Sequence, residues 1–191
     1  MSSAADTVSA GHLLVAQLEA AGLKYSDVTI KNLQPGDALA AFDAGHLAAW
    51  AIWEPFTSQA EQEAGAKVIA DGTKLTNGYV FQVASEVALE DPATKEALAD
   101  YLSRIAQAQG WSQTHQEAWA KGWAEETGLS EDVTLAAVKK RKAQVVPIDQ
   151  TVIDSEQQMA DSFVANDLLP DEFDVAPFFL DDFNDATTGG Q

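Results

Sequence analysis

The sequence predicts an α/β fold in which helices pack on an open sheet. Short apolar or alternating segments typical of strands recur between residues 27 and 84, and segments with helical spacing of apolar side chains separate them. After residue 85 the pattern changes, because long amphipathic segments follow one another without strands. The order α-β-α-β-α-β-β in the first half is typical of helices that cover a sheet. We therefore predict an α/β lobe with ligand-cleft loops over residues 1–85 and a helical part over residues 86–191.

The first half contains three predicted helices and four predicted strands. The helices span residues 11–22, 38–44 and 56–64, with Gly22 ending the first and Asp37 capping the second. The strands span residues 27–33, 47–53, 67–70 and 79–84. The run at 47–53 is almost wholly apolar, which suits a strand covered on both faces. An α/β unit normally opens with a strand, whereas this chain opens with a loop and a helix, so its opening strand is expected to be missing.

The second half contains four predicted helices. They span residues 92–109, 112–127, 130–142 and 149–168, and Ser130 is the expected N-cap of the third. Residues 144–148 are predicted to be extended around Pro147. We expect this helical part to pack on the α/β lobe.

Composition and charge exclude several classes of protein. The chain has 191 residues with 30 Asp and Glu against 11 Lys and Arg, a formal net charge of -19. So acidic a chain repels phosphate backbones, which argues against nucleic-acid binding. No apolar run reaches about 18 residues, the length that spans a bilayer, and no secretory signal peptide is recognisable from Met1 to Gly11. Cys is absent, which excludes disulfides and thiolate metal sites.

Motifs of catalysis and phosphate binding are missing. The sequence contains no GxGxxG, no GxxxxGK[ST] and no GxSxG. Its three histidines, His12, His46 and His115, lie far apart and form no HExxH. We therefore predict no metal, no cofactor and no catalytic residue.

Two features favour a binding site. Residues 7–11 lead into a predicted helix and supply hydroxyl groups and free backbone N–H groups at its start. Such a helix start can bind an anion. An ordinary serine N-cap produces the same pattern. Trp50 and Trp53 lie three apart in a predicted strand, so they should face opposite sides. Trp53 is nearer the strand's carboxyl end, where ligands of open α/β sheets bind. Taken alone, however, the two tryptophans favour a place for both rings in the core.

Several motifs together form a family pattern. They are Thr7-Val8-Ser9, Ala21-Gly22-Leu23, Asp27-Val28, the run Pro35-Gly36-Asp37-Ala38-Leu39-Ala40-Ala41-Phe42, and the run Ala48-Ala49-Trp50-Ala51-Ile52-Trp53-Glu54-Pro55. In this combination the chain resembles the substrate-binding proteins of ABC importers for aliphatic sulfonates, related to those for taurine and nitrate. The resemblance covers residues 9 to about 184, and the W-A-I-W-E-P run in its context is specific. The chain departs from the pattern at Ala48 and Glu54, where the family has Asp.

The resemblance implies a type II periplasmic-binding-protein fold, a two-lobed clamshell that closes on its ligand. This chain then corresponds mainly to the second lobe plus C-terminal helices that return toward the first lobe, with the first lobe missing. The implied ligand is a small organosulfonate or similar anion, and the implied partners are ABC permease subunits. The parent protein is expected to be periplasmic or extracytoplasmic. Carried over on matching motifs, the implied substrate-binding residues are Thr7, Ser9, Trp53, Glu54, Asn77 and Tyr79.

Two alternatives stay open. Half a clamshell would expose apolar surface, so the chain could be a non-binding truncated remnant or an interaction module that self-associates. A clamshell-fold enzyme, such as a pyrimidine-precursor synthase of thiamine biosynthesis, would need a catalytic His or Cys constellation. The isolated histidines and the absence of Cys do not supply one.

Overall fold

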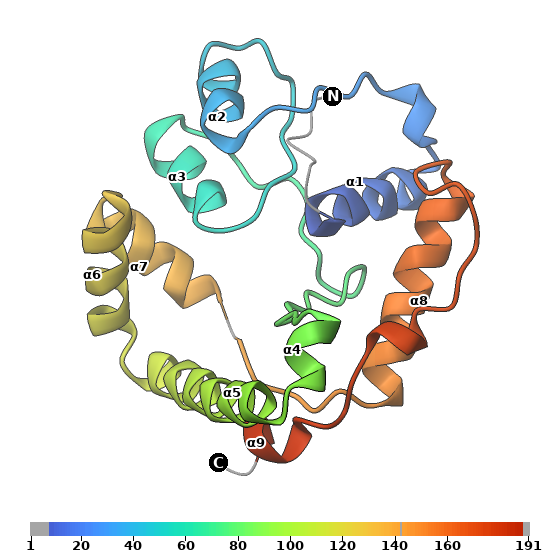
Figure 1. The fold of residues 1–191 in the computed structure, drawn as a ribbon. Coiled ribbons are helices and arrows are strands. Elements are labelled where there is room, and N and C mark those ends of the chain that lie inside the picture. The colour runs from blue at the N-terminus through green and yellow to red at the C-terminus, as the bar shows by residue number, and fades with distance from the viewer. Residues whose placement is uncertain (1–7, 142, 189–191) are drawn as a thin grey trace.

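The computed structural model describes residues 8–141 and 143–188, and the regular elements within these ranges are helices (Figure 1). The first half contains α1 (Val8–Ala20), α2 (Pro35–Asp43) and α3 (Phe56–Glu63). The second half contains α4 (Glu86–Glu90), α5 (Pro92–Thr114), α6 (Gln116–Thr127), α7 (Glu131–Lys140), α8 (Gln150–Ala165) and α9 (Asn184–Thr188). Short 3-10 helices lie at Tyr25–Asp27 and Ala176–Phe178. None of the helices in these ranges combines the length and apolarity needed to cross a membrane.

All seven predicted helices are present, because their end signals are local. Gly22 follows α1 with φ +71°, and Leu23 N donates to Leu18 O at 2.8 Å. This left-handed turn is one that glycine adopts without strain. Ser130 Oγ accepts from Val133 N at 3.3 Å, which confirms Ser130 as the N-cap of α7.

The start of α2 differs from the prediction. The helix begins at Pro35 with Gln34 as N-cap, so Asp37 lies within the first turn and the prediction of Asp37 as the cap is wrong. Proline suits the first helical position, because its φ is already near the helical value and its missing N–H would have had no helical partner there. Helices α4 and α9 were not predicted, since each has only five residues.

The predicted strands are wrong for the described part of the chain. Residues 27–33, 47–53, 67–70 and 79–84 contain no assigned strand there, and no backbone hydrogen bond between described residues joins two of these segments. Apolar residues expected on buried strands are correspondingly exposed: Ile69 by 82%, Val80 by 81% and Val83 by 93%. Alternation of apolar residues is a local pattern, whereas a strand exists only where a second strand pairs with its N–H and C=O groups.

Small apolar interfaces hold the helices together. Helix α6 packs on α7, and the buried Thr134 Oγ1 donates to Ala120 O at 2.9 Å across this contact. Helix α1 buries Leu14, Val15 and Leu18 on one face. A further cluster forms around Ala38 of α2 and Leu47, with Leu33, Ala41, Phe42, Trp50 and Ile52 packed against it.

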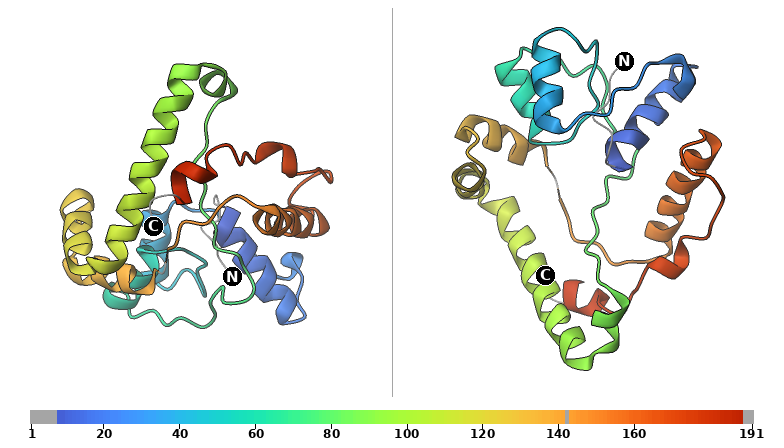
Figure 2. Two further views of the ribbon diagram at one scale, coloured as in Figure 1. Left: turned by 90° about the horizontal axis from the view of Figure 1, so that it is seen from below. Right: turned by 45° about the horizontal axis from the view of Figure 1, so that its top comes forward.

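Two segments far apart in sequence run through the middle of the molecule. Residues 64–85 descend from α3 to α4, and residues 143–149 lead from the end of α7 to α8 (Figures 1 and 2). Helices α1, α2 and α3 lie at one end of these segments and α4 and α9 at the other (Figure 2). Helix α8 runs back along the side of the molecule and contacts α1.

Candidate functional site

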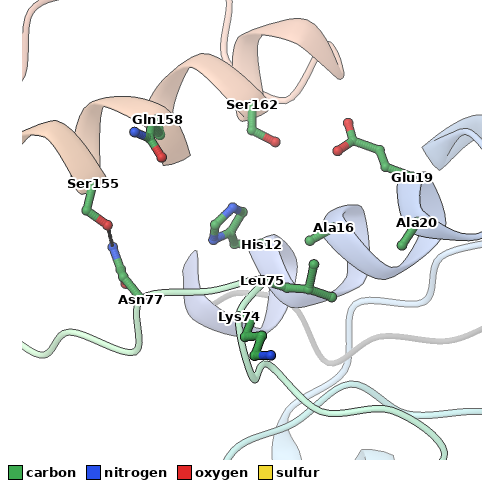
Figure 3. A pocket seen from close by; sticks show the side chains of 10 residues that line it. All are labelled: His12, Ala16, Glu19, Ala20, Lys74, Leu75, Asn77, Ser155, Gln158 and Ser162. Carbon is green, nitrogen blue, oxygen red and sulfur yellow. Dashed lines mark hydrogen bonds between the residues drawn. The ribbon is translucent and has the colours of Figure 1, made fainter.

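A cleft of about 430 Å³ lies between α1, α8 and the segment at residues 74–77 (Figure 3). This volume is within the range of small-molecule sites. The residues that line it are His12, Ala16, Glu19 and Ala20 from α1, Lys74, Leu75 and Asn77, and Ser155, Gln158 and Ser162 from α8.

Helical periodicity explains why these side chains share the cleft. Ser155, Gln158 and Ser162 are three and four residues apart, so they lie along one face of α8. On α1 the lining residues recur with the same spacing, and Leu14, Val15 and Leu18 bury the other face. The cleft therefore has a polar wall on α8 and a wall of mixed polarity on α1.

Asn77 anchors the 74–77 segment to α8. Its Nδ2 donates to Ser155 Oγ at 2.9 Å and to Glu156 Oε1 at 2.6 Å, and its Oδ1 accepts from Tyr79 N at 3.2 Å. Glu156 is only 9% exposed. Burial raises the pKa of the Glu156 carboxyl, and the hydrogen bond from Asn77 partly lowers it again. Asn77 is thus both a lining residue and the partner of a buried acid.

His12 projects from the first half of α1 toward α8 (Figure 3). Its ring packs edge-on against Phe163 with centroids 5.8 Å apart. Burial lowers the pKa of His12, and the charge of Glu19 offsets this in part. The imidazole is therefore neutral at pH 7 and can donate one N–H.

Other polar groups in the cleft are uncommitted. Within residues 8–141 and 143–188, the side chains of His12, Lys74, Gln158 and Ser162 make no hydrogen bond. Uncommitted donors and acceptors around a recess of this size can bind a small polar molecule.

The sequence-predicted residues are only partly brought together. Asn77 lines the cleft, and Tyr79 lies next to it, half-buried, with its ring 6.0 Å from that of Phe81. Thr7 lies outside the described residues. Ser9 belongs to the first turn of α1, but its side chain also lies outside what the structure describes.

Glu54 lies elsewhere, at the start of α3, and is engaged with protein groups. Its Oε2 accepts from Ser58 N at 3.1 Å, and its Oε1 lies 3.1 Å from Lys140 Nζ. Lys140 also pairs with Glu61 of α3. Glu54 thus connects the first turn of α3 with the end of α7.

Trp53 is half-buried and does not line the α1–α8 cleft. Its ring centroid is 6.0 Å from that of Phe56, and that of Trp50 is 6.5 Å from the same ring. The expectation that the two tryptophans face opposite sides assumed a strand, and residues 47–53 do not form one.

Sequence reasoning missed most of the cleft. It treated the three histidines as isolated, and it described the helix around residue 155 by its apolar stripe. The sequence pattern that could have indicated the α8 wall of the cleft is the polar stripe of Ser155, Gln158 and Ser162 at helical spacing. Nothing in the sequence indicates that this stripe faces α1. In the described ranges, no three His, Asp or Glu side chains are placed to hold a metal ion.

Comparison with known proteins identifies the family. The model of the NMT1-like family matches residues 3–128, which is more than half of the chain. The chain belongs to the NMT1-like family. A relative in Escherichia coli (strain K12), provisionally named an aliphatic sulfonates-binding protein, is 32% identical over 168 residues. This alignment covers 87% of the present chain and 52% of the relative, so this NMT1-like chain spans about half the length of the curated relatives it matches.

Two solved structures share the fold of this NMT1-like chain. The periplasmic aliphatic sulphonate-binding protein SsuA from Escherichia coli matches with a TM-score of 0.80 and 30% identity, over 94% of this chain and 58% of that one. The alkanesulfonate-binding protein SsuA from Xanthomonas axonopodis pv. citri, bound to MOPS, matches with a TM-score of 0.79 and 32% identity, over 92% of this chain and 60% of that one. These matches confirm the resemblance to aliphatic sulfonate-binding proteins. The named relatives are binding proteins and not enzymes.

Proposed function

We propose that this chain is part of the substrate-binding component of an ABC importer and that it binds a small organosulfonate or related oxyanion. The observation that carries the proposal is the match of nearly the whole chain to two sulfonate-binding proteins, one of them bound to MOPS. The α1–α8 cleft, with its uncommitted polar side chains, supports the proposal from within this chain. Permease subunits are the proposed partners. The proposed location of the full-length protein is the periplasm or another extracytoplasmic space.

The proposed architecture is a partial type II clamshell. Residues 1–85 correspond to the α/β lobe, and residues 86–191 form the helical part that returns toward a first lobe. The coverage of 58% and 60% of the solved chains supports a partial clamshell, because this chain matches only part of each of them. The apolar side chains of Ile69, Val80 and Val83 are exposed, and a first lobe would cover them.

The proposed ligand contacts extend the family pattern. Asn77 has the best structural support, since it lines the cleft. We keep Thr7 and Ser9 as proposed contacts to the oxyanion at the start of α1, Trp53 and Glu54 as rim contacts, and Tyr79 beside Asn77. Lys74 adds a cation that the family pattern did not indicate. Hydrogen bonds to sulfonate oxygens and packing on the alkyl part would then supply the affinity.

Thermal melts of the 191-residue chain test the proposal. Propanesulfonate, taurine, MOPS and nitrate are added in turn. At a hundredfold excess over Kd, a ligand stabilises the folded state by about 2.7 kcal/mol, which for a chain of this size raises Tm by roughly 5–10 °C. Lys74→Met should reduce the shift, while Lys67→Met, an exposed lysine outside the cleft, should not. No shift with any of the sulfonates would refute the assignment.

The alternative is a non-binding remnant or interaction module. The exposure of Ile69, Val80 and Val83 favours it, because exposed apolar side chains can promote association. Sedimentation of the chain alone distinguishes the two. Concentration-dependent association without any sulfonate effect on Tm supports the alternative, whereas a monomer that sulfonates stabilise refutes it.

A further inference from the structure

We propose that Asn77 is a site of spontaneous modification, at which the side-chain amide is lost as ammonia and the 74–77 segment is released from α8. The site needs no enzyme and no ligand, so it is independent of the proposed function. Asn77 precedes Gly78, and it is the only one of the four asparagines that glycine follows. Glycine favours this reaction, because no side chain hinders the approach of its backbone nitrogen to the amide carbon.

The reaction is a cyclisation followed by hydrolysis. The backbone nitrogen of Gly78 forms a bond to Cγ of Asn77, the Cγ–Nδ2 bond breaks, and the Gly78 N–H proton leaves with the amide nitrogen as ammonia. Because the nucleophile and the amide belong to adjacent residues, this step is intramolecular. Water then opens the resulting succinimide ring at one of its two carbonyl carbons. One opening gives aspartate, and the other gives isoaspartate, in which the backbone runs through the side chain.

The attacking nitrogen of Gly78 is accessible. Gly78 is exposed and has φ +68°, and its N–H donates to no acceptor among the described residues. Apart from its chain neighbours, no heavy atom lies within 4 Å of the position that a Cβ would take. Solvent base can therefore reach this N–H, which must lose its proton in the attack.

The fold holds both polar atoms of the reacting amide. Tyr79 N donates to Asn77 Oδ1 at 3.2 Å, so the negative charge that develops on this oxygen during the attack is stabilised. The leaving Nδ2 lies 2.6 Å from Glu156 Oε1 and 2.9 Å from Ser155 Oγ. Burial raises the pKa of Glu156, so this carboxyl is protonated in weaker acid than an ordinary glutamate and can then donate to the departing nitrogen.

Either product weakens the anchor between the 74–77 segment and α8. A carboxylate at position 77 lacks the N–H groups that Asn77 donates to Ser155 and Glu156. It also places a second negative charge against the buried Glu156, and two carboxylates at such a distance repel each other. The modification therefore separates one wall of the α1–α8 cleft from its support.

Peptide mass spectrometry of the folded 191-residue chain, kept in mildly alkaline buffer, tests this inference. Trypsin cleaves after lysine, so Asn77 lies in the peptide 75–95 and the exposed Asn32 lies in the peptide 32–67. We expect the peptide 75–95 to gain about one mass unit, the difference between an OH and an NH₂ group, and to divide into aspartate and isoaspartate forms. The peptide 32–67 should stay unmodified over the same time.

The same measurement on the chain unfolded in urea is the control for the fold. A gain at residue 77 only in urea, or an equal gain in both peptides of the folded chain, would show that the inference is wrong. Gly78→Ala keeps Asn77 but adds a methyl group beside the attacking nitrogen, so it should slow the gain. An unchanged rate, with circular dichroism showing helical content, would contradict the attack by this nitrogen.

Asn77→Asp introduces one product of the reaction directly. Its Tm should fall below that of the unmodified chain, and the Tm of the chain should fall in the same direction as the modification proceeds. Asn32→Asp adds the same charge at an exposed position and should leave Tm unchanged. If Asn77→Asp lowers Tm no more than Asn32→Asp does, the modification does not release the segment and the inference is wrong.

Discussion

Replacing Asn77 by alanine tests whether the 74–77 segment is anchored to α8. The change removes two hydrogen bonds to α8, at 2.9 Å to Ser155 Oγ and 2.6 Å to Glu156 Oε1, and the local bond at 3.2 Å that Asn77 Oδ1 accepts from Tyr79 N. A bond to a neutral partner contributes about 0.5–1.5 kcal/mol and one to a charged partner about 1.5–3 kcal/mol. Asn77 is only half-buried and water reaches the cleft, so the lower end of each range applies. We expect a loss of about 2.5 kcal/mol and a fall in Tm of roughly 5–10 °C.

Urea and thermal unfolding at two pH values provide the assay. Because the bond from Asn77 stabilises ionised Glu156, Asn77→Ala should cost more at pH 7 than at about pH 4. In a Glu156→Gln background, where no charge is present, the same substitution should cost less, which a double-mutant cycle reports. Asn32→Ala, an exposed asparagine, is the control. A loss no larger than that of the control, or one independent of pH and of Glu156, would refute the anchoring role.

Three further predictions concern stability. Burial raises the pKa of Glu156 above its ordinary value of 4.5, so the folded state binds the extra proton. The free energy by which this proton uptake stabilises the folded state is present in full below pH 4.5. It is lost as the pH rises through the raised pKa of Glu156. Glu156→Gln should therefore stabilise the chain at pH 7 but not at about pH 4 in urea titrations, and equal effects at both would contradict this. Lys140→Ala breaks two partly exposed ion pairs and should cost about 0.5–1 kcal/mol. That cost should be smaller in 1 M salt, because salt screens exposed charges. Lys139→Ala is the control and should leave the free energy of unfolding unchanged. Ser130→Ala removes the N-cap of α7 and should cost about 1 kcal/mol in thermal melts; an unchanged Tm would show that the cap contributes nothing.

The helices were largely predictable because their signals lie close together in the chain. Ser130 caps α7 three residues from the N–H that it accepts, and Gly128 ends α6 with φ +75°. The start of α5 at Pro92 is also a local signal, because proline suits the first position of a helix. The motifs around Trp50 and Trp53 likewise indicated the family, and comparison confirmed it.

The cleft was not predictable in the same way. Asn77 was identified through a family motif, but its partners Ser155 and Glu156 lie 78 and 79 residues away in the sequence. His12 and Glu19 become part of a site only because α8 packs against α1. Their sequence neighbours give no sign of that contact.

The sequence by itself determined where the seven longer helices lie, because capping and periodicity act over a few residues. Its motifs also determined which family the chain belongs to. Only the tertiary structure decided which helix faces meet and what becomes of the extended segments. Residues 79–84 have the composition of a strand, yet Val80 and Val83 are exposed and the segment is unpaired within the described ranges. The reason is physical, since a strand and a binding cleft both require partners from distant parts of a chain, and local sequence does not specify those partners.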